Sequence, residues 1–285
     1  MYGATTTSLG APPVTTECTP ASGSTFPVGT TTVTCTATDA RQRTDSCAFT
    51  VTVTPPPRIS LTRFLAFGDS MTAGEVVDLN SFRGLAVRDD LSYPTDLRIT
   101  LASRYTAQTT TVVNGGRSAE AIVNDRAPSR LSSYLATRQY DVVVILEGAN
   151  DIGSRDSRDI PPAINGLRTM VRDAASRGVR PFLGTLPPAN PNGCCPNRGL
   201  AWSLVEPFNA QLKAMASAEN VPVADVFQAF SGDFSLLGSD GLHPNAAGYQ
   251  RIADTFFLVI KQNLELPPTA SLTGSLPFFA LPRRR

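Results

Sequence analysis

Residues 61–70 read Leu-Thr-Arg-Phe-Leu-Ala-Phe-Gly-Asp-Ser, and this stretch decides the fold that the sequence predicts. Its apolar run is typical of a buried strand, and the glycine, aspartate and serine after it indicate a turn into a helix. Similar apolar runs follow along the chain at 111–114, 141–146, 180–186 and 221–227. We therefore expect five strands, each followed by a change of secondary structure.

Helical patterns lie between these expected strands. Segment 94–105 begins with a proline, which is favoured in the first turn of a helix. Segments 162–177, 201–219 and 246–264 place apolar residues at helical spacing. Strands alternating with helices predict right-handed crossovers and a parallel sheet covered on both faces. The ligand site of such a sheet lies at the carboxyl ends of its strands.

Polar motifs occur where a site of this kind is expected. Ser70 follows the first strand, residues 114–116 (Asn-Gly-Gly) end the second, and residues 148–151 (Gly-Ala-Asn-Asp) follow the third. Residues 240–244 (Asp-Gly-Leu-His-Pro) precede the last helix and contain His243, the only histidine of the chain. Any mechanism that needs an imidazole at neutral pH must use it. A hydroxyl, an imidazole and a carboxylate are the parts of an acyl-transfer triad.

Each of these residues, taken singly, has a simpler structural explanation. Ser70 fits a helix N-cap, and Asn114 and Asn150 fit turns, because asparagine hydrogen-bonds its local backbone. Asp240 with its following glycine is an ordinary turn, and His243 alone would be a surface or core histidine. The one histidine stands three residues after an aspartate, within the fourth of four motifs, and this combination favours catalysis.

Residues 67–70, 114–116, 148–151 and 240–244 together resemble the four blocks of the SGNH (GDSL) esterase/lipase superfamily, in that family's order. The resemblance covers residues 61 to about 265. It implies a flavodoxin-like three-layer α/β/α domain with a central parallel sheet. No Gly-x-Ser-x-Gly nucleophile elbow of the common α/β-hydrolase fold is present.

The resemblance also implies a role for each site residue. Ser70 would be the nucleophile, His243 the general base and acid, and Asp240 the residue that orients the imidazole. The oxyanion would be bound by the backbone N–H groups of Ser70 and Gly116 and by the side-chain amide of Asn150.

Three further features belong to this comparison. Met71 replaces the leucine of the family name, and Ala119 stands where many members have a second glycine. Ser70 is expected to open a helix whose positive end supports the reacting carbonyl. Tyr93 and the stretch 75–90 are hypothesised to line the acyl pocket.

Residues 1–57 differ from the rest in being rich in Thr, Ser, Val and Pro. Runs such as 31–38 and 49–54 alternate β-branched residues, which predicts antiparallel strands and a small β-sandwich, or part of one. The sequence of residues 18–29, 38–39 and 47–53 resembles the C-terminal half of a hyalin-repeat (HYR) module, which is an immunoglobulin-like extracellular domain. The leading strands of such a module are missing.

The five cysteines are interpreted from this context. The HYR resemblance implies a disulfide between Cys18 and Cys35 on neighbouring strands. It also implies that the partner of Cys47 lies in the missing strands. The alternative is that all three cysteines are reduced and buried. Cys194 and Cys195 lie in the loop 187–200. A vicinal disulfide, a link to Cys47 and a redox-sensitive lid all remain open there, because connectivity does not follow from sequence.

The domain organisation predicted from these patterns has four parts. It comprises a partial HYR/Ig-like β module at 1–54, a proline-rich linker at 55–60, an SGNH hydrolase domain at 61–265 and a C-terminal tail at 266–285.

Composition excludes several classes of function. The 285 residues carry 25 basic and 24 acidic side chains, and this net charge of +1 gives no field to attract nucleic acid. No apolar run reaches the length of a membrane span. Asp69 and Asp151 adjoin the expected site, but one histidine and no clustered carboxylate motif argue against a catalytic metal, and no cofactor is expected.

The sequence therefore predicts a serine ester hydrolase that forms an acyl-enzyme on short-chain acyl or acetyl esters, including esters of carbohydrates. The alternatives are an acyltransferase or thioesterase with the same triad, or a silent extracellular adhesion or carbohydrate-binding protein. We expect a secreted or cell-surface location, with contacts to the surface or matrix through the N-terminal module. The N-terminus has no signal-peptide pattern, so we interpret the chain as a fragment of a longer secreted protein.

Overall fold

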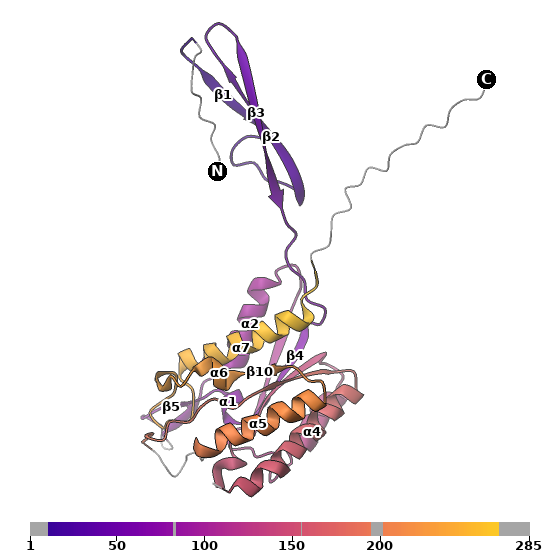
Figure 1. Ribbon diagram of the computed structural model, residues 1–285, viewed down its shortest axis with the longest axis vertical. Coiled ribbons are helices and arrows are strands. Elements are labelled where there is room, and N and C mark those ends of the chain that lie inside the picture. Colours follow the sequence, from indigo (N-terminus) through magenta and orange to yellow (C-terminus); the bar gives the residue numbers. More distant parts are fainter. Residues whose placement is uncertain (1–10, 82–83, 155, 195–201, 268–285) are drawn as a thin grey trace, which may run out of the picture. The chain divides into compact units, whose positions relative to one another are not determined.

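The computed structural model describes residues 11–81, 84–154, 156–194 and 202–267. The chain forms two compact units, and the boundary between them falls between Pro56 and Pro57 (Figure 1). The larger unit spans Pro57–Leu266 and contains the expected sheet.

The sheet of the larger unit has five parallel strands in the order β10-β9-β8-β4-β7. Numbered along the chain, this is the 2-1-3-4-5 order of flavodoxin-like folds, so the predicted fold class is confirmed. The strands are β4 (Arg63–Gly68), β7 (Thr111–Gly116), β8 (Val142–Leu146), β9 (Arg180–Gly184) and β10 (Val223–Ala224). Every residue of β8 is buried, as expected for a strand covered on both faces.

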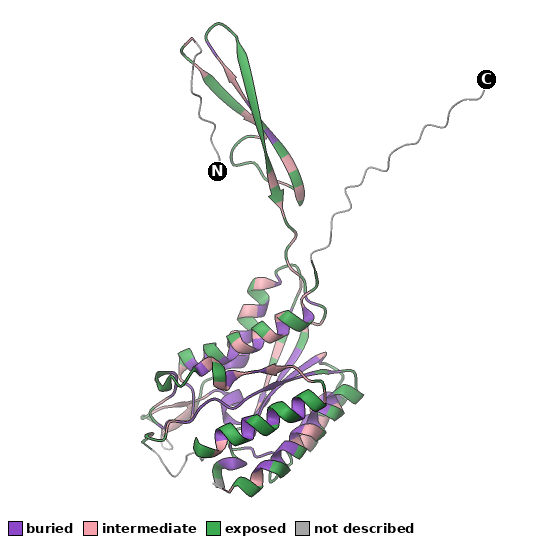
Figure 2. Cartoon of the chain, viewed as in Figure 1, coloured by how far each residue is buried: buried purple, intermediate pink, exposed green. Residues whose placement is uncertain are grey.

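Helices cover both faces of this sheet (Figures 1 and 2). On one face α2 (Tyr93–Arg104) packs against α7 (Ala246–Leu264), which also contacts α6 (Val226–Phe230). On the other face α4 (Ile160–Ser176) lies between α3 (Ala127–Ala136) and α5 (Trp202–Ala218). Figure 2 shows α4 and α5 with buried residues along one side and exposed residues along the other, which is the pattern of amphipathic helices on a sheet.

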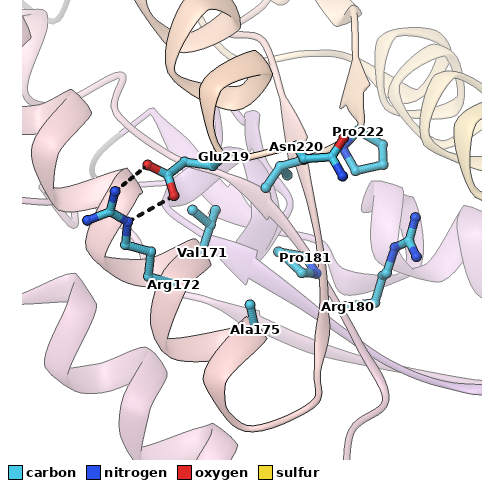
Figure 3. A pocket seen from close by; sticks show the side chains of 9 residues that line it. Val171, Arg172, Ala175, Arg180, Pro181, Glu219, Asn220 and Pro222 are labelled. Carbon is cyan, nitrogen blue, oxygen red and sulfur yellow. Dashed lines mark hydrogen bonds and ion pairs between the residues drawn. The ribbon is translucent and has the colours of Figure 1, made fainter.

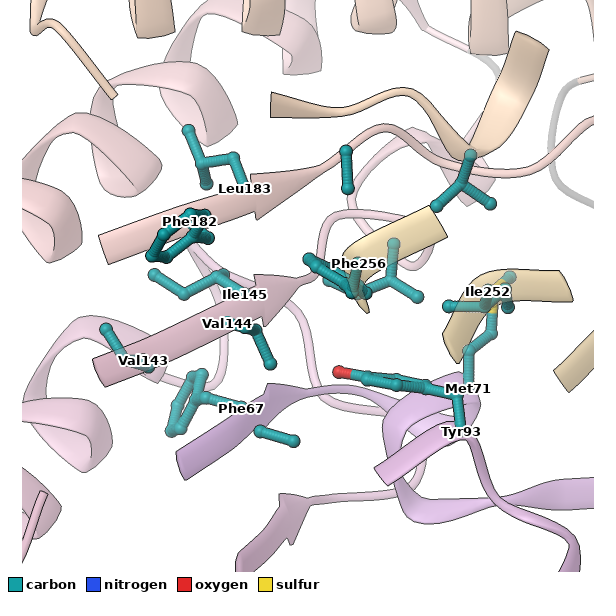
Figure 4. Close-up of a cluster of buried hydrophobic side chains, with 14 of the residues drawn as sticks. Phe67, Met71, Tyr93, Val143, Val144, Ile145, Phe182, Leu183, Ile252 and Phe256 are labelled. Atoms are coloured by element: carbon teal, nitrogen blue, oxygen red, sulfur yellow. The ribbon is translucent and has the colours of Figure 1, made fainter. Parts of the chain in front are cut away.

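The core consists of strand side chains packed against these helices (Figure 4). Phe67 and Phe182 come from β4 and β9, and Met71 comes from the short helix after β4, Ser70–Ala73. Tyr93 of α2 stacks on Phe256 of α7 with ring centroids 5.5 Å apart. The core therefore extends to the carboxyl ends of the strands and supports the loops there.

Short elements complete the larger unit. They are the helix α1 (Ser70–Ala73), the hairpin β5 (Glu75–Val77) with β6 (Leu85–Val87), and the 3-10 helices η1 (Asp89–Leu91), η2 (Ile152–Ser154), η3 (Ser157–Asp159) and η4 (Phe234–Leu236). Within the described part of the chain, no helix is both long and apolar enough to cross a membrane.

One expected strand is shorter than predicted, and one helix was not expected. The strand expected at 221–227 is only Val223–Ala224, because Asp225 caps α6 by accepting the N–H of Gln228 at 3.2 Å. Helix α3 was not expected, although its buried residues Ala127, Leu131 and Leu135 stand four positions apart, which is helical spacing.

The smaller unit is an antiparallel sheet of β1 (Thr15–Thr19), β2 (Gly29–Thr38) and β3 (Thr44–Val53), with β2 in the middle. Cys18 and Cys35 lie opposite each other in the register and form the disulfide that the HYR resemblance implies. Cys47 lies opposite Cys35 on the other side and is a free, exposed thiol. Residues 11–56 contain this one sheet only, which is part of what a sandwich requires.

Cys195 lies outside the described residues, as does most of the expected tail at 266–285. Cys194 is described and exposed. A vicinal disulfide there remains a prediction.

Candidate active site

The turn after β4 places Ser70 at the carboxyl end of that strand, which lies between β8 and β7 in the sheet. Gly68 permits this turn, because a Cβ atom there would lie 2.0 Å from the carbonyl oxygen of Leu146. Asp69 caps α1 by accepting the N–H of Met71 at 2.9 Å, so Ser70 is the first residue of the helix, not its cap. Helix α1 has only four residues, so its dipole is much weaker than expected for a helix opened by the nucleophile.

Three predicted site residues are hydrogen-bonded to one another. His243 Nε2 lies 3.0 Å from Ser70 Oγ, although the two residues are 173 positions apart in the sequence. His243 Nδ1 lies 2.7 Å from Asp240 Oδ2. All three side chains belong to buried residues, with exposed fractions of 4–6% for Ser70, Asp240 and His243. The arrangement is that of a serine nucleophile, a base and an orienting carboxylate.

Hydrogen bonds within the loop before α7 position the imidazole. Asp240 Oδ1 accepts the backbone N–H groups of Leu242 and His243, each at 3.1 Å. The carbonyl of His243 accepts the N–H of Gly238 at 2.7 Å. Asp240 therefore uses one oxygen to shape the loop and the other to orient the ring.

The charges around the imidazole favour its protonated form. Burial alone would lower the pKa of His243, but hydrogen bonds to Asp240 and Glu75 outweigh burial and raise the pKa to about 9. Burial raises the pKa of Asp240, yet its hydrogen bonds with His243 bring it below the ordinary value. Glu75 Oε2 lies 3.3 Å from Nε2, the same atom that faces Ser70. The sequence placed Glu75 only within the stretch 75–90, and nothing in the motifs indicated this contact.

Two of the predicted oxyanion donors, Asn150 and Gly116, differ in how their N–H groups are already used. Asn150 is exposed and donates one amide hydrogen to the carbonyl of Glu120 at 2.7 Å. Its second amide hydrogen is a further donor. Gly116, in contrast, donates its N–H to Asn114 Oδ1 at 2.9 Å, and a Cβ atom at Gly116 would lie 2.1 Å from the nitrogen of Ala73. The structure therefore packs Gly116 against α1 and uses its N–H within the loop.

Acidic side chains gather beneath the site. Asp151 accepts the N–H groups of Ile122 and Val123 at 2.8 and 3.1 Å, and so supports the loop beside Asn150. Burial raises the pKa of Asp69 to about 7 and raises that of Glu147 well above its ordinary range. In the described part of the chain, no three His, Cys, Asp or Glu side chains are grouped so that they could hold a metal ion.

Tyr93 does not line a pocket as hypothesised. It is fully buried between α2 and α7, and its hydroxyl lies 3.2 Å from Thr72 Oγ1. Its role is to pack beneath the nucleophile turn.

A separate pocket lies at the opposite ends of the strands (Figure 3). It is lined by Arg180 at the start of β9, residues 219–222 before β10, and one side of α4. Arg172 and Glu219 form an ion pair across it, with Nη2 2.7 Å from Oε1. Its lining contains no nucleophile or imidazole, so it is not the site that the motifs define.

The order of the sheet and the hydrogen-bonded serine, histidine and aspartate define a flavodoxin-like α/β protein with the side chains of an acyl-transfer site. The chain belongs to the GDSL-like Lipase/Acylhydrolase family, which matches residues 66–251. The HYR domain family matches residues 5–53.

Individual relatives agree with this assignment. A GDSL-like esterase of Mycobacterium tuberculosis is 29% identical over 142 residues, which cover 44% of this chain and 41% of the relative. An acetylxylan esterase of Xylanibacter ruminicola is 24% identical over 228 residues, covering 73% of this chain and 45% of the relative. The matches thus span less than half the length of these two relatives. The crystal structure of a lipase/acylhydrolase from Enterococcus faecalis is similar with a TM-score of 0.58 and 25% identity, covering 72% of this chain and 97% of that one.

Proposed function

We propose that the protein is a serine carboxylic ester hydrolase that acts through an acyl-enzyme on short-chain esters, in particular acetyl esters of carbohydrates. The observation that carries the proposal is the continuous hydrogen-bonded path from Ser70 Oγ through His243 to Asp240. The acetylxylan esterase among the relatives supports the substrate class.

The chemistry follows from the positions of these three side chains. Ser70 Oγ attacks the ester carbonyl carbon while its proton passes to Nε2 of His243. The tetrahedral intermediate collapses when Nε2 gives this proton to the departing alcohol oxygen, leaving the acyl group on Ser70. Water then repeats the two steps, and the carboxylic acid leaves. Asp240 stays ionised and stabilises the charged imidazole in between.

The oxyanion requires preorganised donors near Ser70. We assign two of them to the N–H of Ser70 and the amide of Asn150. For the third, the loop that follows β7 offers Ala119 in place of Gly116. Ala119 has a left-handed backbone with φ of 60°, and Asn150 binds the carbonyl of the next residue, Glu120. This hydrogen bond brings the backbone around Ala119 beside Asn150.

An extracytoplasmic location fits the smaller unit. The Cys18–Cys35 disulfide and the match to the HYR family are both typical of proteins outside the cytoplasm. We propose that this unit contacts the cell surface or matrix.

The test is hydrolysis of p-nitrophenyl esters from acetate to palmitate by the parent, Ser70→Ala and His243→Ala. We expect activity on short chains that falls on the order of 10⁴-fold or more in both variants, because each removes a member of the triad. Ser103→Ala, a change at an exposed serine in α2, should keep the parent rate. Activity that survives His243→Ala would contradict the mechanism, since the chain has no other histidine.

Product analysis with an added alcohol separates the alternatives. Formation of a new ester in place of the free acid would indicate an acyltransferase. A parent without activity on any ester would indicate a binding protein.

A further inference from the structure

Glu75 shares the catalytic nitrogen of His243 with the nucleophile. Its Oε2 lies 3.3 Å from Nε2, and Ser70 Oγ lies 3.0 Å from the same atom. The Glu75 side chain is 17% exposed, whereas that of His243 is 5% exposed. The carboxylate therefore lies at the edge of the site, between the buried imidazole and solvent.

Three features hold the backbone of Glu75 in this place. Gly74 ends α1 with a left-handed φ of 88°, which turns the chain directly into β5. The carbonyl of Glu75 accepts the hydroxyl of Tyr249 at 2.5 Å. Glu75 also pairs with Val87 in the β5–β6 hairpin. Together they fix the backbone of Glu75 beside the catalytic loop.

The contact between Glu75 and His243 opposes the transfer of the Ser70 proton to Nε2. Nε2 carries at most one hydrogen, and it must be unprotonated to accept the hydrogen of Ser70. A carboxylate at 3.3 Å instead stabilises the protonated ring, and with Asp240 it raises the pKa of His243 to about 9. Among the described residues, Asp69 at the nucleophile turn interacts electrostatically with the ring, and Tyr249 on α7 interacts with Glu75 and Asp240. Nε2 itself lies 3.0 Å from Ser70 Oγ and 3.3 Å from Glu75 Oε2.

The position of Glu75 also places it beside the departing alcohol. Nε2 must deliver a proton to the leaving oxygen, which therefore comes within hydrogen-bond distance of that nitrogen. A hydroxyl group on the neighbouring carbon of the alcohol then lies within reach of the carboxylate. Sugars and other polyols carry such a hydroxyl, whereas simple alkyl esters do not.

We propose that Glu75 is a specificity-determining residue whose carboxylate accepts a hydrogen bond from a hydroxyl group next to the ester oxygen, and that this contact draws it away from His243. The substrate thereby frees Nε2 to act as the base. Esters of polyols are favoured over esters of simple alcohols for this reason. The inference rests on the proposed ester hydrolase function and names the part of the alcohol that the site recognises.

The test compares two esters that differ in a single donor, 2-hydroxyethyl acetate and 2-methoxyethyl acetate, by titrating the acid released. The parent should hydrolyse the hydroxyl ester with a kcat/KM about tenfold higher, as expected for a hydrogen bond to a charged group. In Glu75→Gln this preference should fall to less than about twofold, because a neutral amide accepts a weaker hydrogen bond. The lower limb of the pH profile for the methoxy ester should also move to lower pH in this variant.

Glu206→Gln is the matched control. It makes the same chemical change at an exposed glutamate in α5, and it should keep both the hydroxyl preference and the pH limb of the parent. A parent that hydrolyses both esters equally would overturn the role of Glu75 while leaving the ester hydrolase function intact. An unchanged preference or an unmoved pH limb in Glu75→Gln would do the same. A parent that hydrolyses neither these esters nor p-nitrophenyl acetate would instead overturn the proposed function.

Discussion

Glu147 follows β8 with its whole side chain buried beneath the nucleophile turn. Neither of its carboxylate oxygens is hydrogen-bonded to any described residue. Burial and the neighbouring Asp69 raise its pKa well above 4.5, so the folded protein favours the neutral acid. Sequence patterns could not indicate this state, because Glu147 stands among polar motif residues where an exposed carboxylate would be ordinary.

The state of Glu147 makes stability depend on pH. Above pH 4.5 the unfolded chain loses this proton while the folded protein keeps it, so the folded state binds more protons. The free energy of unfolding therefore falls as pH rises. In Glu147→Gln this loss is absent, so the stability of the variant relative to the parent should be higher at pH 8 than at pH 5. The difference grows by up to about 1.4 kcal/mol per pH unit while the folded carboxyl group stays protonated.

Urea unfolding of the parent and the variant at both pH values measures this difference. Glu206→Gln, a change at an exposed glutamate in α5, serves as the control and should show no such trend. The same ΔΔG for Glu147→Gln at pH 5 and pH 8 would contradict a neutral Glu147.

At the scale of elements, the short segment after Ser70 shapes the site more than its length suggests. Helix α1 and strand β5 have four and three residues and are joined by Gly74. A Cβ atom at Gly74 would lie 2.7 Å from the carbonyl oxygen of Arg88 and 2.7 Å from Ser92 Cβ. Strand β5 also packs against the catalytic loop, since a Cβ atom at Gly238 would lie 2.6 Å from Val77. The turn at Gly74 therefore fixes the nucleophile and Glu75 together.

Gly74→Ala should destabilise the protein by roughly 2–4 kcal/mol, because it combines left-handed strain with a backbone clash, and it should lower kcat as well. Gly178 is the matched comparison, because its φ is 75° and a Cβ atom there would meet nothing within 4 Å. Gly178→Ala should cost only about 1 kcal/mol, with kcat unchanged. Equal effects of the two changes on stability and kcat, measured by thermal unfolding and steady-state kinetics, would refute this role for Gly74.

At the scale of the whole molecule, the two units are stabilised differently. The larger unit has an extensive hydrophobic core, whereas the described hydrophobic residues buried in the smaller unit are Val33 and Cys35. The smaller unit thus depends strongly on its disulfide, which joins residues 17 positions apart. Domains too small for a full core are commonly stabilised in this way.

Replacing Cys18 and Cys35 together by alanine should cost the smaller unit about 3 kcal/mol, because the unfolded chain gains the entropy of an open loop. Amide hydrogen exchange in β1 and β2 should accelerate. The fluorescence of Trp202, the only tryptophan, reports on α5 and should show an unchanged unfolding transition of the larger unit. Cys47→Ala leaves the disulfide intact and should change neither the amide exchange nor the Trp202 transition. A shifted Trp202 transition in the double variant would show that the two units are not independent.

The sequence by itself determined the layered α/β architecture, because alternating apolar runs and amphipathic segments are local patterns that each element carries in its own residues. It also indicated which side chains belong at the carboxyl edge of the sheet, since parallel strands bring their ends together. The structure places Ser70, Asp240 and His243 there in contact.

Only the tertiary structure decided the contacts between loops. The contact between Glu75 and His243 and the hydrogen bond from Asn150 to the carbonyl of Glu120 both depend on packing between distant segments. Such contacts leave no periodic signal, because a loop residue meets its partner through the fold of the whole domain and not through its neighbours in the chain.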